Sequence, residues 1–129
     1  MKRVAIALIQ DWKQDILMGR RSDNGLMSQP GGHCERGECP YESCVREVKE
    51  ETGLDPKTVK LVKVKMGGKD GKVMIYLFEV TVDPEQQVDT SNDPDKEFKH
   101  LEYVDPSTVM DELHVPIEYN TLLQYWMDN

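Results

Sequence analysis

The sequence has no long hydrophobic run, few cysteines and a shortage of positive charge. A membrane-spanning helix needs about 20 consecutive apolar residues, so none is expected here. The apolar stretch 4–9 is short and has no small-residue cleavage site after it, so a first strand is the better interpretation than a signal peptide. We therefore expect a cytoplasmic protein that does not enter a membrane.

The three cysteines are an odd number, which argues against a disulfide framework. They are Cys34, Cys39 and Cys44, and His33 precedes the first. A zinc cluster of these residues would place stoichiometric zinc in the purified protein, but the spacing does not follow the common zinc patterns. The other interpretation is that Cys44 is a small core residue and that the remaining two lie in a loop.

The charge is acidic, because 16 Lys and Arg face 24 Asp and Glu and the formal net charge is −8. Such a chain is not expected to bind nucleic acid through a general basic surface. A nucleotide ligand is still compatible with this charge, because a bound cation reverses the local sign. The chain contains no repeat or low-complexity tract, and its 129 residues suffice for one domain over residues 1–129.

Apolar periodicity and turn residues predict alternating strands and helices. Strands are expected at 3–10, 15–20, 61–66, 72–82 and 100–104, and helices at 40–52, 106–113 and 117–127. The first two strands are expected to pair as a hairpin through a turn at 11–14, and the third and fourth through a turn at 67–71. Segment 22–29 is expected to be irregular, and 83–97 to be a mobile loop.

The helix at 40–52 has clear ends, with Pro40 suited to its first turn and Gly53 to its C-terminal cap. Its expected buried face consists of Tyr41, Cys44, Val45, Val48 and Thr52. In the last helix, an apolar stripe is expected to join the core rather than a cofactor site. That stripe consists of Leu122, Leu123 and Trp126.

Three glutamates share one face of the helix at 40–52. Each helical residue advances about 100°, so Glu50 and Glu51 lie within about 60° of Glu47. Like charges that close repel each other, so a fold gains no stability by collecting them. A hard cation such as Mg²⁺ removes the repulsion, because it binds carboxylate oxygens and leaves positions open for phosphate. The pattern therefore indicates a magnesium site beside the turn Pro30-Gly31-Gly32.

These glutamates belong to a longer pattern. Gly32 is followed after five residues by Glu38, and after seven more by Arg-Glu-Val-Lys-Glu-Glu-Thr-Gly-Leu at 46–54. The pattern resembles the Nudix box, G-x5-E-x7-R-E-U-x-E-E-x-G-U, where U is a bulky aliphatic residue, and every defined position is filled. The resemblance implies an α/β fold, a single-domain Nudix-type α/β/α sandwich with a central mixed β-sheet.

The resemblance also implies a reaction and a cofactor. Nudix enzymes hydrolyse a pyrophosphate bond in a nucleoside diphosphate linked to another group, with Mg²⁺ or Mn²⁺ held by the box. The implied ligands are Glu47, Glu50, Glu51 and the main-chain carbonyl of Gly32, where the missing side chain lets a metal approach. Clustered carboxylates of this kind hold cations that clamp phosphates and lower the pKa of bound water.

Two further residues of the box have implied roles. Arg46 is expected to orient a neighbouring carboxylate, and Glu38 to hold a water near the site or to pair with Arg46. The alternative for Arg46 is a surface salt bridge worth less than about 1 kcal/mol. The complete box favours the functional interpretation.

Outside the box, the segment 96–104 resembles the family segment that carries a further glutamate, used as ligand or base. Glu97 is the better match, and the alternative is one more solvated charge in an acidic loop. Arg20 and Arg21 resemble the arginines with which MutT-like members approach substrate phosphate, and Arg21 is the closer match.

The expected substrate is a small nucleotide. The short chain and the Pro-Gly-Gly lead resemble MutT-type enzymes, which convert a nucleoside triphosphate into a nucleoside monophosphate and pyrophosphate. ADP-ribose or another nucleotide sugar, and dinucleoside polyphosphates, stay open. The aromatic residue that is usual before the Pro-Gly-Gly turn is missing from 25–29, and Gln29 replaces an apolar residue. Both departures fall where a wall of the base pocket is expected.

A second class of function also stays open, because some Nudix domains sense nucleotides without hydrolysing them. Those domains usually lose box glutamates, whereas Glu38, Glu47, Glu50 and Glu51 are all present here. For an enzyme, the general base is expected to be Glu47 or Glu50, and after these Glu97. The residues do not indicate an oligomeric state.

Overall fold

Two β-sheets form the centre of the molecule, which is known from a computed structural model that describes residues 1–68 and 70–129. The strands in this part of the chain are β1 (Lys2–Ile9), β2 (Ile16–Arg21), β3 (Met27–Ser28), β4 (Gly31–His33), β5 (Pro56–Gly67), β6 (Val73–Val82) and β7 (Phe98–Val104). The first sheet has the order β4-β1-β6-β5 and is mixed, because β1 is parallel to β6 and antiparallel to β4. The second sheet, β3-β2-β7, is antiparallel.

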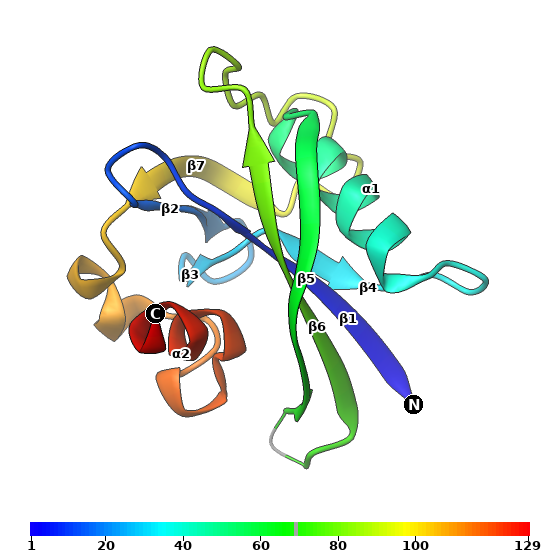
Figure 1. Cartoon of the computed structure of the whole chain (residues 1–129). Coiled ribbons are helices and arrows are strands. Elements are labelled where there is room, and N and C mark those ends of the chain that lie inside the picture. The colour runs from blue at the N-terminus through cyan, green and yellow to red at the C-terminus, as the bar shows by residue number, and fades with distance from the viewer. Residues whose placement is uncertain (69) are drawn as a thin grey trace.

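Helices α1 (Pro40–Thr52) and α2 (Thr121–Asp128) cover opposite faces of the first sheet (Figure 1). Side chains alternate across a strand, so neighbouring residues of β1 enter different cores. Ala5 belongs to the core that contains Cys44 of α1, whereas Ile6 belongs to the core that contains Leu122 of α2. The expected α/β/α sandwich is thereby confirmed.

The expected hairpin between the first two strands is wrong. β1 and β2 join different sheets, and in the described part of the chain their ladder pairing is limited to an isolated bridge between Gln10 and Ile16. The turn itself forms, since Asp11 Oδ1 accepts from the main-chain N–H groups of Lys13 and Asp15. β1 is buried from Ala5 onward and takes a central position between β4 and β6, which leaves no edge of β1 free for β2.

Helix α1 has the predicted bounds, and Gly53 caps it in the left-handed conformation with φ of 74°. Cys44, Val48 and Thr52 are buried as expected. The prediction is wrong for Tyr41, which is 52% exposed and packs edge-on against Phe78. The helix instead buries Ser43 and Glu51, the latter on the side that packs against β4. Val45 is only partly buried.

Several short elements differ from the prediction. Segments expected to be irregular or a turn contain β3 and β4, and β5 and β7 begin earlier than expected. The helix expected at 106–113 is two 3₁₀ turns, Pro106–Thr108 and Met110–Glu112. A further 3₁₀ turn, Ile117–Tyr119, precedes α2, because Asn120 leaves helical geometry and caps α2 through Leu123 N–H. The turn expected at 67–71 includes Lys69, which lies outside the described residues.

Leu122 and Leu123 are fully buried, and Trp126 packs against their core, as predicted for the last helix. Across the described residues, none of the helices combines the length and the apolar character that a membrane span requires.

Candidate active site

The glutamates of α1 face β4, the short strand that contains the two glycines. The N–H of Gly31 donates to Glu51 Oε1 at 2.8 Å. A Cβ atom on Gly32 would lie 2.8 Å from Glu47 Oε1, closer than real Cβ contacts allow. Glycine at position 32 therefore lets the Glu47 carboxylate lie directly against the main chain of β4.

Glu51 is the most unusual acidic residue of the molecule, because it is only 1% exposed. Its Oε2 atom has no hydrogen-bond partner among the described residues. Burial raises the pKa of this carboxyl far above its usual range. A hydrogen bond that its protonated form donates to Glu97 raises the pKa further, and so do the charges of Glu97 and Glu47. A buried oxygen without a partner costs stability, and a bound cation or a proton on this oxygen would remove that cost.

Arg46 lies between the other carboxylates of the box. Its guanidinium donates to Glu38 at 2.8 and 3.0 Å, to Glu47 at 2.9 Å and to Glu50 at 3.3 Å. The hydrogen bond from Arg46 lowers the pKa of Glu38 to about 2. The pairing with Arg46, one of the two expectations for Glu38, is what the structure shows, and one guanidinium orients both Glu47 and Glu50.

Glu47 responds to two opposing effects. Burial raises its pKa, Arg46 acts in the opposite direction, and the charges of Glu50 and Glu97 raise the pKa again. These contributions mean that the α1 glutamates and Glu97 lie close enough for their charges to interact, although Glu97 follows Glu51 by 46 positions in the chain.

Arg21 joins this cluster and Arg20 does not. Arg21 donates to Glu97 at 2.9 Å and to Asp23 at 3.0 Å. Arg20 binds Glu112 and the carbonyl of Gly25 instead. Neighbouring residues of a strand point to opposite faces, and the pairing with β7 shifts register between these two arginines. The preference for Arg21 as the phosphate-binding arginine has this geometry in its favour.

The donor set meets part of what a metal requires. In the part of the chain that the structure describes, no three His, Cys, Asp or Glu side chains are arranged as a ready ligand set, and Arg46 bonds to both Glu47 and Glu50. The unpartnered Glu51 oxygen and the close approach of Glu47 to Gly32 nevertheless fit a hard, oxygen-ligated cation. Residues that can hold such a cation are therefore present.

The zinc alternative does not fit. Cys44 is 1% exposed inside the α1 core, and burial raises the pKa of its thiol to about 12. A zinc ligand must be a thiolate, which this environment disfavours. All three cysteines are free, and Cys39 is exposed just before α1.

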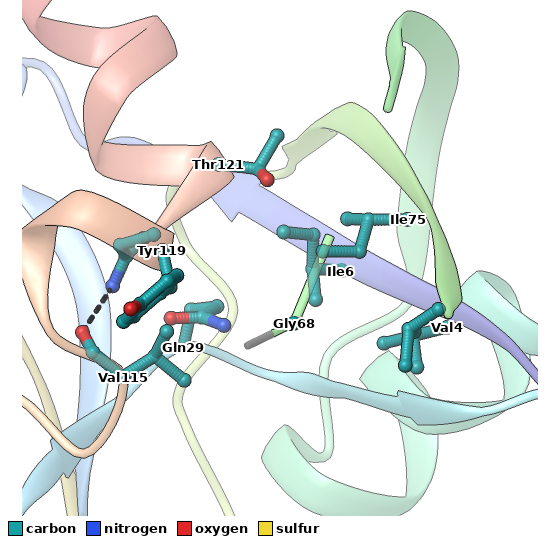
Figure 2. A pocket seen from close by; sticks show the side chains of 10 residues that line it. Val4, Ile6, Gln29, Gly68, Ile75, Val115, Tyr119 and Thr121 are labelled. Atoms are coloured by element: carbon teal, nitrogen blue, oxygen red, sulfur yellow. Dashed lines mark hydrogen bonds between the residues drawn. The ribbon is translucent and has the colours of Figure 1, made fainter. Parts of the chain in front are cut away.

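An apolar cavity of about 190 Å³ lies on the face of the first sheet opposite to α1 (Figure 2). One wall comes from β1 and β6 and the other from the segment 115–121. Its lining includes Val4, Ile6, Gln29, Ile75 and Tyr119. Of the stretch 25–29, where the sequence predicts a wall of the base pocket, Gln29 lines this cavity, and the contribution of 115–121 to the cavity was not predicted. The polar Glu118-Tyr119-Asn120 stretch, which interrupts the expected helix at 117–127, is the signal that was available.

Comparison with known proteins identifies the family. The family model of the NUDIX domain matches residues 1–125. Over 64 residues the chain is 44% identical to the ADP-ribose pyrophosphatase of Methanocaldococcus jannaschii, covering 47% of this chain and 38% of that protein. Over 58 residues it is 34% identical to the 8-oxo-dGTP diphosphatase of Escherichia coli, covering 42% of this chain and 45% of that protein. The chain thus spans less than half the length of these relatives.

Among solved structures, the C. elegans Ap4A hydrolase binary complex superposes with a TM-score of 0.74. That match covers 99% of this chain and 96% of the other at 16% identity, so it shows the fold alone. Together with the box geometry, the match over residues 1–125 defines the class: the chain belongs to the Nudix family.

Proposed function

We propose that this protein hydrolyses a pyrophosphate bond in a nucleoside diphosphate derivative, with Mg²⁺ or Mn²⁺ as cofactor. One observation carries the proposal: Glu47, Glu51 and Glu97 interact within one partly buried cluster, and Glu51 Oε2 is buried without a partner among the described residues. A stable core has no use for such an arrangement, whereas a cation with phosphate on its open positions removes the repulsion.

The proposed ligands are Glu47, Glu50, Glu51, Glu97 and the main-chain carbonyl of Gly32. When bound, the cation would neutralise phosphate charge and lower the pKa of the attacking water. Phosphoryl transfer needs positioning and charge neutralisation more than covalent chemistry, so carboxylates on a rigid helix suit it.

The protein side chains supply the remaining steps. Glu47 or Glu50 accepts the proton of the attacking water, with Glu97 as the next candidate. Arg46 positions the first two of these carboxylates, and Glu38 fixes the orientation of Arg46. Arg21, whose guanidinium lies at Glu97, is proposed to bind substrate phosphate.

Within this class, we propose a nucleoside triphosphate as substrate, with a nucleoside monophosphate and pyrophosphate as products. The MutT-like lead of the box supports this choice, and the apolar cavity offers a place for the base. β4 is the edge strand of the first sheet, Gly32 in it lies against Glu47 of α1, and Gln29 of the cavity wall precedes the strand by two residues. The proposed path of the nucleotide therefore crosses the sheet at this edge. We also propose a cytoplasmic location, which three free cysteines support.

A nucleotide panel tests the substrate. Nucleoside triphosphates, ADP-ribose and a dinucleoside tetraphosphate are each incubated with Mg²⁺, and the release of pyrophosphate, phosphate and monophosphate is followed. Pyrophosphate release from triphosphates would support the proposal. Turnover of ADP-ribose alone would move the substrate to the nucleotide sugars, and nucleotide binding without hydrolysis under Mg²⁺ or Mn²⁺ would favour a sensor.

The first prediction concerns Glu50. Replacing Glu50 by Gln keeps its shape but removes a negative charge and a proton acceptor, so turnover should fall roughly 100-fold or more while the fold remains. The measurement is kcat with the best substrate of the panel, beside circular dichroism. Glu85→Gln, at an exposed loop position, is the matched control and should keep wild-type activity. Near-full activity of Glu50→Gln would contradict the assignment.

A further inference from the structure

Gln29 is the residue of the cavity wall best placed to recognise a polar ligand. It stands directly before Pro30 and lines the cavity together with residues of β1 and β6. We propose that its side-chain amide selects the nucleobase by hydrogen-bonding the edge of the base. This proposal rests on the proposed function, because it assigns the cavity to the nucleoside.

Most of the cavity offers no hydrogen bonds. Val4 and Ile6 of β1, with Val73 and Ile75 of β6, present only hydrocarbon. Such walls accept the flat faces of any base and cannot distinguish one base edge from another. Selection therefore has to come from the polar side chains on the wall.

Asn120, the other amide in the lining, is already committed to the fold. Its Oδ1 accepts from the N–H of Leu123 at 3.0 Å, and its Nδ2 donates to the carbonyl of Val115 at 3.1 Å. The second of these bonds is the dashed line in Figure 2. Since these bonds cap α2 and hold the preceding turn, Asn120 would have to break them to bind a base.

Gln29 is free of such commitments. Within residues 1–68 and 70–129, its side-chain amide takes part in no hydrogen bond, and Ser28 Oγ donates only to its main-chain carbonyl. Figure 2 shows the amide between Tyr119 on one side and Ile6 and Ile75 on the other. An amide carries a donor beside an acceptor in one plane, which matches a base edge with an acceptor beside a donor.

The position of Gln29 also connects the base with the phosphates. Two residues after it, the N–H of Gly31 donates to Glu51, and Gly32 lies against Glu47. Three extended residues span roughly 10 Å, so a base at Gln29 leaves its phosphates within reach of the α1 carboxylates across the β4 edge.

The test measures base preference without relying on bond cleavage. Binding of AMP, GMP, CMP and UMP is measured by calorimetry at pH 8 with Mg²⁺, for the wild type, Gln29→Leu and Gln29→Glu. Leucine keeps the approximate size but removes the hydrogen bonds, so the affinity ratio between the best and worst base should fall about tenfold. A carboxylate accepts hydrogen bonds and donates none. Gln29→Glu should therefore shift the ratio of GMP affinity to AMP affinity about tenfold in favour of GMP, whose base presents two neighbouring donors.

The matched controls are Gln87→Leu and Gln87→Glu at an exposed loop position, which should keep the wild-type ratios. Equal ratios in the wild type and both Gln29 variants, or no binding of any monophosphate, would overturn the proposal. If the monophosphate ratios depend on Gln29 while no triphosphate is hydrolysed, the role of Gln29 stands and the proposed reaction fails.

Discussion

At the scale of single residues, Arg46 organises the box. Its one guanidinium contacts Glu38, Glu47 and Glu50, so three carboxylates share the same positive charge. Glu38 is the carboxylate with two hydrogen bonds to Arg46, and its side chain is only 14% exposed. An ion pair of this kind is stronger than the isolated surface salt bridge considered from the sequence alone.

The second prediction follows from Glu38. Its pKa is lowered from 4.5 to about 2, so the ionised form contributes stability above pH 4.5 that is lost as pH falls toward 2. Glu38→Gln should reduce the free energy of unfolding at pH 7 by about 1–2 kcal/mol, and this difference from the wild type should shrink in acid. Urea unfolding across this pH range measures both effects.

Glu35→Gln is the control, because Glu35 lies 3.7 Å from Arg46 and is 69% exposed, and it should change stability little. A wild-type-to-Glu38→Gln difference that stayed constant from pH 7 to pH 2.5 would contradict the assigned pairing.

At the scale of elements, the site depends on β4 packing against α1. β4 has only three residues, and its glycines allow the strand to lie against both β1 and the helix. A Cβ on Gly31 would collide with the main-chain carbonyl of Ala5, whereas a Cβ on Gly32 would meet only the flexible end of Glu47. The first glycine is thus required by the sheet and the second by the site.

The third prediction uses this difference. In Gly32→Ala, the Glu47 carboxylate can rotate away, so the free energy of unfolding should change by less than about 1 kcal/mol. Activity should fall at least tenfold, because Glu47 loses its position. Gly71→Ala should lower the free energy of unfolding and leave activity unchanged. Its φ of 67° strains an alanine, while no atom lies within 4 Å of the new methyl group.

Denaturant unfolding and kcat/KM for the same two variants provide the measurement. Loss of stability without loss of activity in Gly32→Ala would mean that β4 does not position Glu47.

At the scale of the whole molecule, the fold keeps an unfavourable group inside. The Glu97 carboxylate lies beside the buried Glu51, and burial keeps the pKa of Glu51 raised. Because its pKa is raised, the folded state binds this proton more tightly than the unfolded state, and stability without metal falls as pH rises above the usual range of a carboxyl. A cation that binds here has to displace that proton, so its affinity grows with pH.

The fourth prediction concerns metal and stability together. MgCl₂ should raise the Tm of the wild type over the value in EDTA, and more so at pH 8.5 than at pH 6. Glu51→Gln should be at least as stable as the wild type in EDTA, since a neutral amide replaces the buried carboxyl, and it should lose the response to Mg²⁺. Thermal unfolding measures these shifts, and Glu85→Gln should retain the wild-type response. An undiminished Mg²⁺ shift in Glu51→Gln would show that the cation binds elsewhere.

Much of the site could be predicted because its information is local. The bounds of α1, its cap at Gly53 and the shared face of Glu47, Glu50 and Glu51 all follow from helical period and terminal residues. The box spacing indicated the family that the comparison then confirmed. The strand order could not be predicted in this way, because β1 pairs with β6 rather than with β2, and that pairing depends on contacts between segments distant in the sequence.

By itself, the sequence determined the acidic helix, the presence of a glycine segment beside it and the family, because a few residues of fixed spacing encode them. Only the tertiary structure decided that Glu51 is buried, that Arg21 and not Arg20 reaches Glu97, and that Gln29 lines a cavity with 115–121. Burial and contact across distant segments arise from packing, and packing depends on all the elements at once.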